Sequence, residues 1–318
     1  MMGSLLLACS GVSGSSLGAP PRERTGCTAE PLEQCASQTV EGIDVFDGQG
    51  VIDWSAVAGA GIGFAMIKAT QGTYDTQATF ASNWPASRRA GVRRGAYHFF
   101  DPTEDGVAQA QRFLAAVGPL AAGDLPPMLD LECPDGDPDC LGTGAAGNAP
   151  AAVIAGRMWD WIHAVEAATG TRPLVYTFAD YFASSGVDPT GLDAYPLFLA
   201  QPAAPSGAPR ACFTVPSPWS RAAMWQYSWN GAVSGVDGAV DRDRFLGSAA
   251  DLVAFAALAV ATDGSREAGA SESDGGWARD AVAAPGSVSA AVPAVGGPPG
   301  SIAEGGETDA WPGSPGCY

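Results

Sequence analysis

The chain has 318 residues, of which 42 are glycine and 25 are proline, and its formal net charge is −18. This length allows one large domain or two medium ones. The negative charge argues against nucleic acid or an anionic membrane surface as a partner, because both are bound through basic patches.

Residues 1–9 end in Leu6-Leu7-Ala8-Cys9, which resembles a bacterial lipobox, where the cysteine is lipidated after signal cleavage. We therefore predict a truncated lipoprotein-type signal over 1–9, lipidation of Cys9, and export to the cell envelope or the medium. The segment lacks a positively charged start and its apolar run is short, so a chance apolar run is the alternative. No later stretch is apolar over the roughly 20 residues that a membrane span needs.

Six further cysteines follow: Cys27, Cys35, Cys133, Cys140, Cys212 and Cys317. An even number in an exported chain indicates disulfides. We predict the pairs Cys27–Cys35 and Cys133–Cys140, because each encloses a short loop. Cys212 with Cys317 is left by elimination only. A metal site is not expected, because the chain has no Cys-x-x-Cys spacing and only two histidines.

The two ends of the chain differ in composition from its middle. Residues 10–39 are rich in Ser, Gly and Pro and predict a flexible linker. Residues 262–318 form a low-complexity Ala/Gly/Pro/Ser-rich tail that cannot bury a core. Residues 40–261 between them predict a single catalytic domain.

Short apolar runs alternate with helical patterns through this domain. In chain order, the expected elements are strands over 42–46 and 63–70, a helix over 78–90, a strand over 95–100, a helix over 103–117, a strand over 127–132, a helix over 149–169, strands over 174–178, 195–200, 222–227 and near 240, and a helix over 248–261.

Eight strands with helical crossovers in the first half predict an α/β fold, a modified (β/α)8 TIM-like barrel. The second half has too little room for regular helices, so some helices are expected to be missing. Chemistry in such barrels lies at the carboxyl ends of the strands. Polar side chains gather near those ends: Asp44, Lys68, Tyr97, His98, Asp130, Glu132, Tyr176, Gln226 and Asp241.

Asp130 and Glu132 end the apolar run 127–132. Side chains alternate along a strand, so the two acids lie on one face with Cα atoms roughly 7 Å apart. Two carboxylates at the end of an apolar strand are costly unless they are paired or used. Such a pair is what glycoside hydrolysis requires.

Several motifs along residues 41–246 resemble the family 25 glycoside hydrolases, the Chalaropsis-type lysozyme or N-acetylmuramidase family. They are Gly42-Ile43-Asp44-Val45, residues 64–72, residues 90–99, residues 124–132, Trp225-Gln226-Tyr227 and residues 240–245. The resemblance implies a barrel with missing helices. It also implies cleavage of the β-1,4 bond between N-acetylmuramic acid and N-acetylglucosamine in peptidoglycan, without a cofactor.

By this resemblance Glu132 is the general acid/base, and Asp130 orients the acetamido group of the substrate in a substrate-assisted step. Asp44 and Asp241 are the other catalytic acids. Lys68, Tyr97 and Tyr176 match positions that line the sugar-binding cleft. The stretch Phe46-Asp47-Gly48 departs from the family pattern, which alters one wall of the cleft.

A physical argument supports the role of Glu132 as the acid. Carboxyl groups that lie close together cannot all be ionised, so one of the four acids retains its proton at a higher pH. We expect this acid to be Glu132. Residues 225–227 alternate faces; we assign Trp225 and Tyr227 to substrate binding and Gln226 to the outer face, although the sequence leaves this phase open. His98 is expected to be a hydrogen-bonded core residue, and Asp243 to be structural.

The leading hypothesis is an exported, monomeric muramidase with peptidoglycan strands as its partner and a membrane contact only through a lipid anchor. The alternatives are a glycosidase of the same fold that cleaves another N-acetylated glycan, and a surface lipoprotein that binds glycan without cleaving it.

Overall fold

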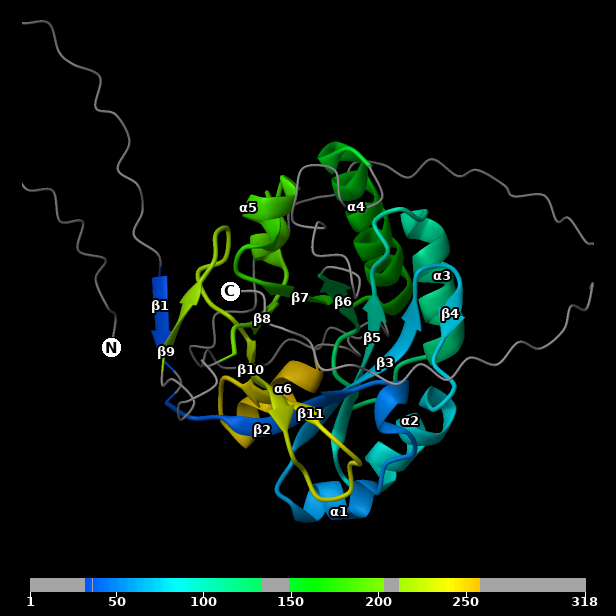
Figure 1. The fold of residues 1–318 in the computed structure, drawn as a ribbon, viewed down its shortest axis with the longest axis vertical. Helices are drawn as coiled ribbons and strands as arrows, with labels where there is room; N and C mark the ends of the chain where they lie inside the picture. Colours follow the sequence, from blue (N-terminus) through cyan, green and yellow to red (C-terminus); the bar gives the residue numbers. More distant parts are fainter. Residues whose placement is uncertain (1–31, 36, 133–148, 203–211, 258–318) are drawn as a thin grey trace, which may run out of the picture.

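The computed structural model describes residues 32–35, 37–132, 149–202 and 212–257. The barrel strands are β2 (Val40–Val45), β3 (Phe64–Gln71), β5 (Arg93–Phe99), β6 (Met128–Leu131), β7 (Leu174–Phe178), β8 (Leu197–Ala200), β10 (Met224–Gly231) and β11 (Val240–Phe245). They pair in this order, and β11 pairs with β2, so the sheet closes (Figure 1). The short β4 (Asp75–Thr76) extends β3. The predicted eight-stranded α/β barrel is therefore confirmed.

Helices cover the first half of the barrel more fully than the second (Figure 1). They are α1 (Trp54–Gly59), α2 (Phe80–Arg89), α3 (Gly106–Val117), α4 (Ala151–Thr169), α5 (Tyr181–Ser185) and α6 (Ala249–Ala257), with 3-10 turns at Asp47–Gln49 and Leu192–Ala194. Only the five-residue α5 and a 3-10 turn join β7 to β8, so the expected loss of helices is confirmed. None of the helices in the described ranges is both long and apolar enough to cross a membrane.

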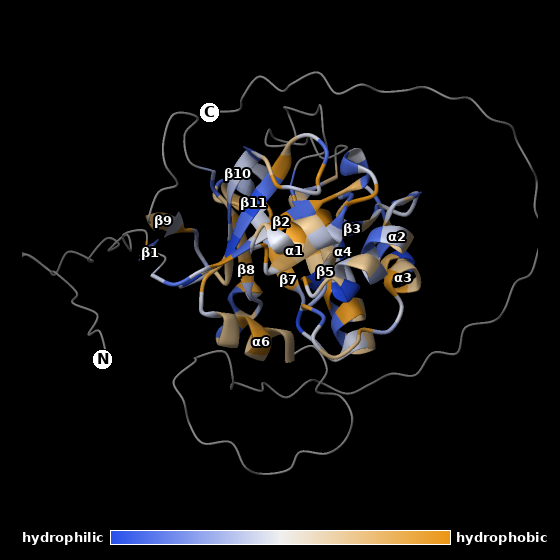
Figure 2. Cartoon of the chain, turned by 90° about the horizontal axis from the view of Figure 1, so that it is seen from below, coloured by the Kyte–Doolittle hydropathy of each residue, from blue (hydrophilic) through white to orange (hydrophobic). Residues whose placement is uncertain are grey.

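Alternation along the strands sorts the apolar side chains into two clusters. The outer cluster fills the space between the sheet and the helices, and includes Leu129 and Leu131 of β6. The inner cluster fills the barrel, and includes Met128 of β6. Phe255 of the apolar helix α6 belongs to the inner cluster, so this helix closes one end of the barrel (Figure 2).

Glycine allows the inner layer to pack closely. A Cβ atom on Gly42 of β2 would lie 2.2 Å from the ring of Phe64 on β3, and one on Gly95 of β5 would lie 2.4 Å from Sδ of Met66. Both distances are far below van der Waals contact, so these positions leave room for the large side chains of the neighbouring strand.

One strand runs against the others. The pairs β10–β11 and β11–β2 are antiparallel, and the remaining ring pairs are parallel. The start of β11 therefore lies at the barrel end where the parallel strands finish, and Asp241 stands opposite Asp44 in register. Asp241 therefore lies at the end of the barrel where we expected it. It stands near the start of an antiparallel strand, however, and not at the end of a parallel one.

A buried ion pair lies near the start of β5. Arg94 donates from Nε and Nη2 to the two carboxylate oxygens of Asp124, at 2.8 and 3.1 Å. Its guanidinium also lies 3.8 Å from the ring centre of Trp84. Asp124 accepts a third bond from Nη1 of Arg88 at 3.2 Å. Both Asp124 and Arg94 are buried, so this pair is part of the core.

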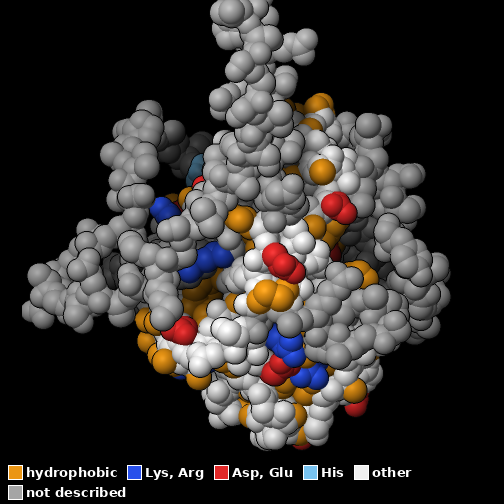
Figure 3. Space-filling model, turned by 90° about the vertical axis from the view of Figure 1, so that its left-hand side faces the viewer, with side chains coloured by type: hydrophobic (Ala, Val, Ile, Leu, Met, Phe, Trp, Pro, Cys, Tyr) orange, Lys and Arg blue, Asp and Glu red, His pale blue; other side chains and the backbone are white. Residues whose placement is uncertain are grey.

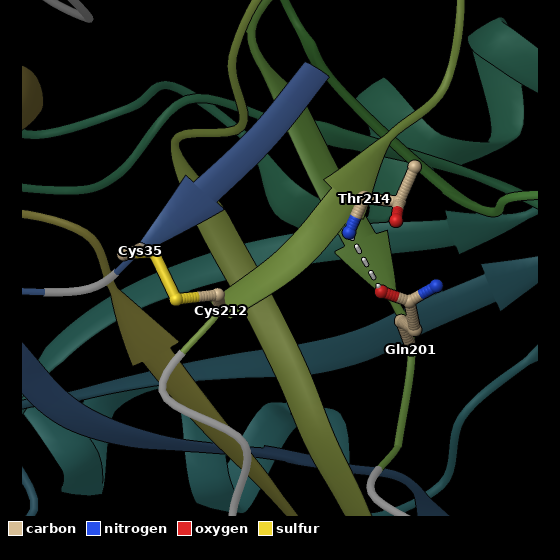
Figure 4. Close-up of a disulfide and its surroundings, with 4 residues drawn as sticks. All are labelled: Cys35, Gln201, Cys212 and Thr214. Atoms are coloured by element: carbon tan, nitrogen blue, oxygen red, sulfur yellow. Dashed lines mark hydrogen bonds between the residues drawn. A yellow bond between two sulfur atoms is a disulfide. The ribbon is translucent and has the colours of Figure 1, made fainter. Parts of the chain in front are cut away.

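The disulfide in the described structure links Cys35 to Cys212. Strand β1 (Leu32–Cys35) pairs antiparallel with β9 (Cys212–Val215), and the two cysteines are register partners (Figure 4). Next to this bond, Gln201 accepts a hydrogen bond from the Thr214 amide (Figure 4). Acidic and basic side chains lie side by side on the face of the molecule that includes β1 and β9 (Figure 3).

This bond corrects one predicted pairing. Cys27–Cys35 is wrong, because strand pairing places Cys35 opposite a cysteine 177 positions away. Cys212, for which elimination alone had left Cys317, is the partner of Cys35. Cys133–Cys140, Cys9 and the tail lie outside the described residues. The linker predicted over 10–39 does not hold for residues 32–35, since these form β1.

Candidate active site

Asp130 of β6 and Glu132, which follows this strand, keep the expected alternation. Met128 of this strand belongs to the inner apolar cluster, and Asp130, two positions later, is only 4% exposed. Asp130 pairs in register with Phe99 of β5 and Tyr176 of β7. Glu132 comes directly after the strand and is half-buried. The pair therefore lies at the carboxyl end of the parallel strands, on the side that faces the barrel interior.

Asp44 and Asp241 meet on neighbouring strands at the same end of the barrel. They are register partners between β2 and β11. The side-chain amide of Gln226 donates from Nε2 to Oδ2 of Asp44 at 2.8 Å and, more weakly, to Oδ2 of Asp241 at 3.4 Å. One amide thus contacts both carboxyl groups and fixes their relative positions.

Asp243 adds a further acid that the sequence analysis treated as structural. It lies two positions after Asp241 on β11, and its side chain is fully buried. Burial, with the charges of Asp44 and Asp241, raises the pKa of Asp243 well above its usual range. An interaction with the Asp243 carboxyl group in turn lowers the pKa of Asp44. The sequence does indicate this position of Asp243, because residues two apart on a strand, such as Asp241 and Asp243, have their side chains on one face.

These acids differ in how strongly they hold a proton. Burial raises the pKa of Asp44 to about 6, although the hydrogen bond from Gln226 and the interaction with Asp243 act in the opposite direction. Burial also raises the pKa of Asp241 to about 9, and the charges of Asp44 and Glu132 add to this effect. At neutral pH Asp241 therefore keeps its proton, whereas Asp44 is largely ionised. Glu132 as the proton donor stays a prediction.

Tyr97 and Tyr176 lie among the predicted acids. Both phenols are buried, and burial raises the pKa of each well above its ordinary value. The charges that add to this rise are the same for both tyrosines and come from Asp44, Asp130, Asp241 and Glu132. The structure therefore brings the four predicted acids together around two phenols.

Gln226 occupies the centre of this network, and the predicted phase of β10 is wrong. Its side chain is 1% exposed, and its Oε1 accepts hydrogen bonds from Tyr176 Oη and Trp229 Nε1, both at 2.8 Å. Trp225 faces the other way. It is 0% exposed in the outer cluster, where its Nε1 donates to the backbone oxygen of Gln201.

Tyr227 also lies on the outer side of the strand, where its hydroxyl donates to Glu41 at 2.6 Å and Arg244 covers its ring. Arg242 and Arg244 both pair with Glu41. Trp225 and Tyr227 therefore do not line the barrel interior. The error has a physical cause, because alternation fixes which residues share a face but not which face is inside.

Two further polar residues on these strands have well-defined partners. His98 is fully buried and bonds through its two ring nitrogens to Thr70 Oγ1 at 2.7 Å and Gln109 Oε1 at 3.0 Å. The predicted core role of His98 is therefore confirmed. Lys68 donates to Gln71 Oε1 at 2.7 Å, and its Nζ lies 4.6 Å from the ring centre of Phe99. Its cleft role stays a prediction.

The arrangement suits acid–base chemistry on a polar substrate. Neutral carboxyl groups are available to give a proton, and ionised ones stabilise positive charge that develops in a transition state. Within the described residues, His, Cys, Asp and Glu form no group of three or more that is arranged to hold a metal ion.

Residues 43–236 match the family model described as Glycosyl hydrolases family 25. The chain belongs to this family. It is therefore a glycoside hydrolase, and its substrate is a glycan. The matched region begins in β2 and ends after β10, so it includes Asp44, Asp130, Glu132 and Gln226.

Two curated relatives are named as a lysozyme and a muramidase. The chain is 37% identical to Lysozyme M1 of Streptomyces globisporus over 253 residues, which cover 76% of this chain and 77% of that protein. It is 34% identical to the N,O-diacetylmuramidase of Chalaropsis sp. over 65% of this chain and 99% of that protein.

Solved structures agree with the fold of this family 25 member. The bacterial lysozyme from Streptomyces coelicolor aligns with a TM-score of 0.61 at 34% identity, over 70% of this chain and all of the other. The family 25 lysozyme from Aspergillus fumigatus aligns with a TM-score of 0.59 at 30% identity, again over 70% of this chain and all of the other.

Proposed function

We propose that this chain is a muramidase that hydrolyses the β-1,4 bond between N-acetylmuramic acid and N-acetylglucosamine in peptidoglycan. Glu132 is the general acid/base, Asp130 assists it, and Asp44 and Asp241 complete the set of catalytic acids. The observation that supports this most strongly is the convergence of these four carboxyl groups on Tyr97 and Tyr176 at one end of the barrel.

The position of Glu132 suits a proton donor. It follows the last residue of β6 and is half-buried, so it is reachable from outside while Asp130 below it is enclosed. The bond to be cleaved needs a proton on its leaving oxygen and stabilisation of an oxocarbenium-like charge. Glu132 supplies the proton, and the ionised members of the cluster stabilise the positive charge.

Asp130 acts from a more buried position on the same side of the strand. We assign to it the orientation of the acetamido group of the substrate, whose oxygen approaches the reacting carbon in a substrate-assisted step. A carboxylate beside that group balances the positive charge that develops on the amide nitrogen. Lys68 stands on β3 and contacts Gln71 and Phe99, and we propose that it binds a polar group of the sugar.

The named relatives support this substrate. One is a lysozyme, and another is an N,O-diacetylmuramidase. An enzyme that acts on peptidoglycan must reach the wall, so we also propose export of the chain, with Cys9 as its candidate lipid anchor. We propose that it acts as a monomer, because one barrel holds every acid of the cluster.

The decisive experiment measures release of reducing ends from purified peptidoglycan by the full chain, by Glu132→Gln and by Glu33→Gln. Glu33 provides the matched control, because it undergoes the same chemical change at an exposed position on β1. We expect Glu132→Gln to lower kcat by about 10²–10⁴-fold with no change in the thermal midpoint. Glu33→Gln should behave as the wild-type chain.

The same assay with chitin tests the alternatives. Equal turnover of chitin and peptidoglycan would favour a glycosidase of broader specificity. Binding of peptidoglycan without release of reducing ends would favour a glycan-binding protein. A Glu132→Gln chain as active as the wild type would overturn the assignment of the general acid.

A further inference from the structure

Trp229 differs from the other tryptophans of the barrel. Its side chain is 57% exposed, whereas those of Trp54, Trp84, Trp161, Trp219 and Trp225 are at most 9% exposed. An exposed indole leaves a large apolar surface in water, which is unfavourable unless a partner covers it.

The indole of Trp229 is held in place although it is exposed. Its Nε1 donates to Oε1 of Gln226 at 2.8 Å. That amide is itself fixed by Tyr176 and by Asp44, each at 2.8 Å. The edge of the ring is therefore tied to the buried acid network, while much of its surface faces solvent. A side chain held in this way loses little conformational freedom when a ligand binds.

An irregularity in β10 turns the side chain of Trp229 toward Gln226. Gln226 pairs with Asp243, but Ser228 pairs with Arg242, so two residues of β10 advance for one of β11. In a regular strand Trp229 would share a face with Trp225 and Tyr227, on the outside of the barrel. The extra residue is a β-bulge, which reverses the phase and turns the later side chain toward Gln226.

We propose that Trp229 forms a sugar-binding subsite at the mouth of the barrel, where its indole stacks on the apolar C–H face of a pyranose ring. This inference rests on the proposed function, because it takes the glycan strand as the ligand. The stacked sugar belongs to the same glycan strand as the bond that is cleaved, and Trp229 does not act on that bond. Trp229 is thus a positioning residue for the glycan strand.

The chemistry of both partners fits. An indole offers a flat apolar face with a polar edge, and a pyranose offers a flat C–H face ringed by hydroxyl and acetamido groups. Because the polar edge of Trp229 is occupied by Gln226, the apolar face is the part left for a ligand. Stacking of this kind acts on substrate and transition state alike, so its loss changes KM and not kcat.

The first test compares wild type, Trp229→Ala, Trp229→Phe and Trp159→Phe for cleavage of soluble peptidoglycan oligomers. We expect Trp229→Ala to raise KM about 2- to 12-fold, the range of an aromatic stacking contact, with kcat and the thermal midpoint unchanged. Trp229→Phe should recover most of the affinity. Trp159 lies on α4, where it stacks on His163, and its replacement should change neither constant.

The second test does not depend on turnover. Glu132→Gln, alone and combined with Trp229→Phe, is titrated with the same oligomers while tryptophan fluorescence is recorded. We expect a saturable change in the single variant that is largely lost in the double variant. If the double variant shows the same change, or if Trp229→Ala leaves KM unaltered, the subsite is refuted.

The two proposals fail in different ways. A wild-type chain that releases no reducing ends, combined with a fluorescence change that needs Trp229, would overturn the proposed hydrolysis and leave the subsite standing. Normal cleavage by Trp229→Ala at wild-type KM would overturn the subsite and leave the hydrolysis standing.

Discussion

Replacement of Asp241 by asparagine should change how the stability of the barrel depends on pH. The folded state raises the pKa of Asp241 to about 9, whereas an unfolded aspartate has a pKa of about 3.9. Between these values the folded chain binds one more proton than the unfolded chain. Since the folded pKa is the higher one, the stabilisation is complete below the unfolded pKa and is lost as the pH rises through the folded pKa.

The expected magnitude follows from one proton. Where Asp241 is protonated in the folded state and ionised in the unfolded state, the free energy of unfolding falls by about 1.4 kcal/mol per pH unit. From pH 7 to pH 8.5 this amounts to about 2 kcal/mol. In a domain of about 150–250 residues, 1 kcal/mol shifts Tm by about 2–4 °C, so Asp241 lowers Tm by roughly 4–8 °C across this interval.

Thermal unfolding followed by circular dichroism at pH 7, 7.5, 8 and 8.5 measures this slope. This pH range excludes the titration of His98. Burial lowers the pKa of His98 to about 4 in the folded state, so its contribution to stability rises with pH and is complete by pH 7. Asp193→Asn is the matched control, because Asp193 is exposed in the 3-10 turn before β8. Asp241→Asn should have the shallower slope, and Asp193→Asn should keep the slope of the wild type.

A slope in Asp241→Asn equal to that of the wild type would refute the reasoning. It would mean that Asp241 is ionised in the folded state at pH 7, so that the proton held by the cluster resides elsewhere. Asp243→Asn would then be the variant expected to flatten the curve, because burial and neighbouring charges also raise the pKa of this acid.

Three other changes test the described contacts. Gln226→Leu removes the amide between Asp44 and Tyr176; each buried group left unpaired costs about 1–3 kcal/mol, so both Tm and kcat should fall, as measured by calorimetry and reducing-end release. Asp124→Asn leaves the buried guanidinium of Arg94 without its counter-charge, and urea unfolding should show a loss of about 3–5 kcal/mol. Replacing Cys35 and Cys212 by serine opens a loop of 177 residues, and urea unfolding should show a loss of about 2–4 kcal/mol.

Each of these changes has a control or an outcome that contradicts it. Gln226→Glu keeps the shape of the side chain but adds another acid, so it should lower kcat further than the leucine variant does. An Asp124→Asn chain as stable as the wild type would show that the ion pair adds nothing to stability. The serine double variant should match the wild-type chain treated with a reducing agent.

The sequence predicted the barrel because its signals are local and repeated. Apolar runs of strand length, helical patterns between the early ones and acids after a strand all arise from burial and alternation, which act within a few residues. The place of Asp130 and Glu132 follows from such a pattern. So does the core role of His98, since it neighbours Tyr97 and points to the opposite face.

The errors concern pairing between distant segments. Alternation alone does not tell whether Trp225 or Gln226 faces inward, because the choice depends on the register of β10 against β8 and β11. The partner of Cys35 depends on the pairing of β1 with β9, which no local loop reveals. Nor does the sequence mark the bulge that turns Trp229 toward Gln226.

The buried acids explain how a chain with a net charge of −18 assembles so many carboxyl groups in one barrel. If all of them were ionised, their repulsion in a desolvated site would oppose folding. Burial instead keeps Asp241 protonated at neutral pH and raises the pKa of Asp243 well above its usual range. Folding therefore leaves a neutral carboxyl group beside ionised ones, which lowers the repulsion around Glu132, the proposed proton donor.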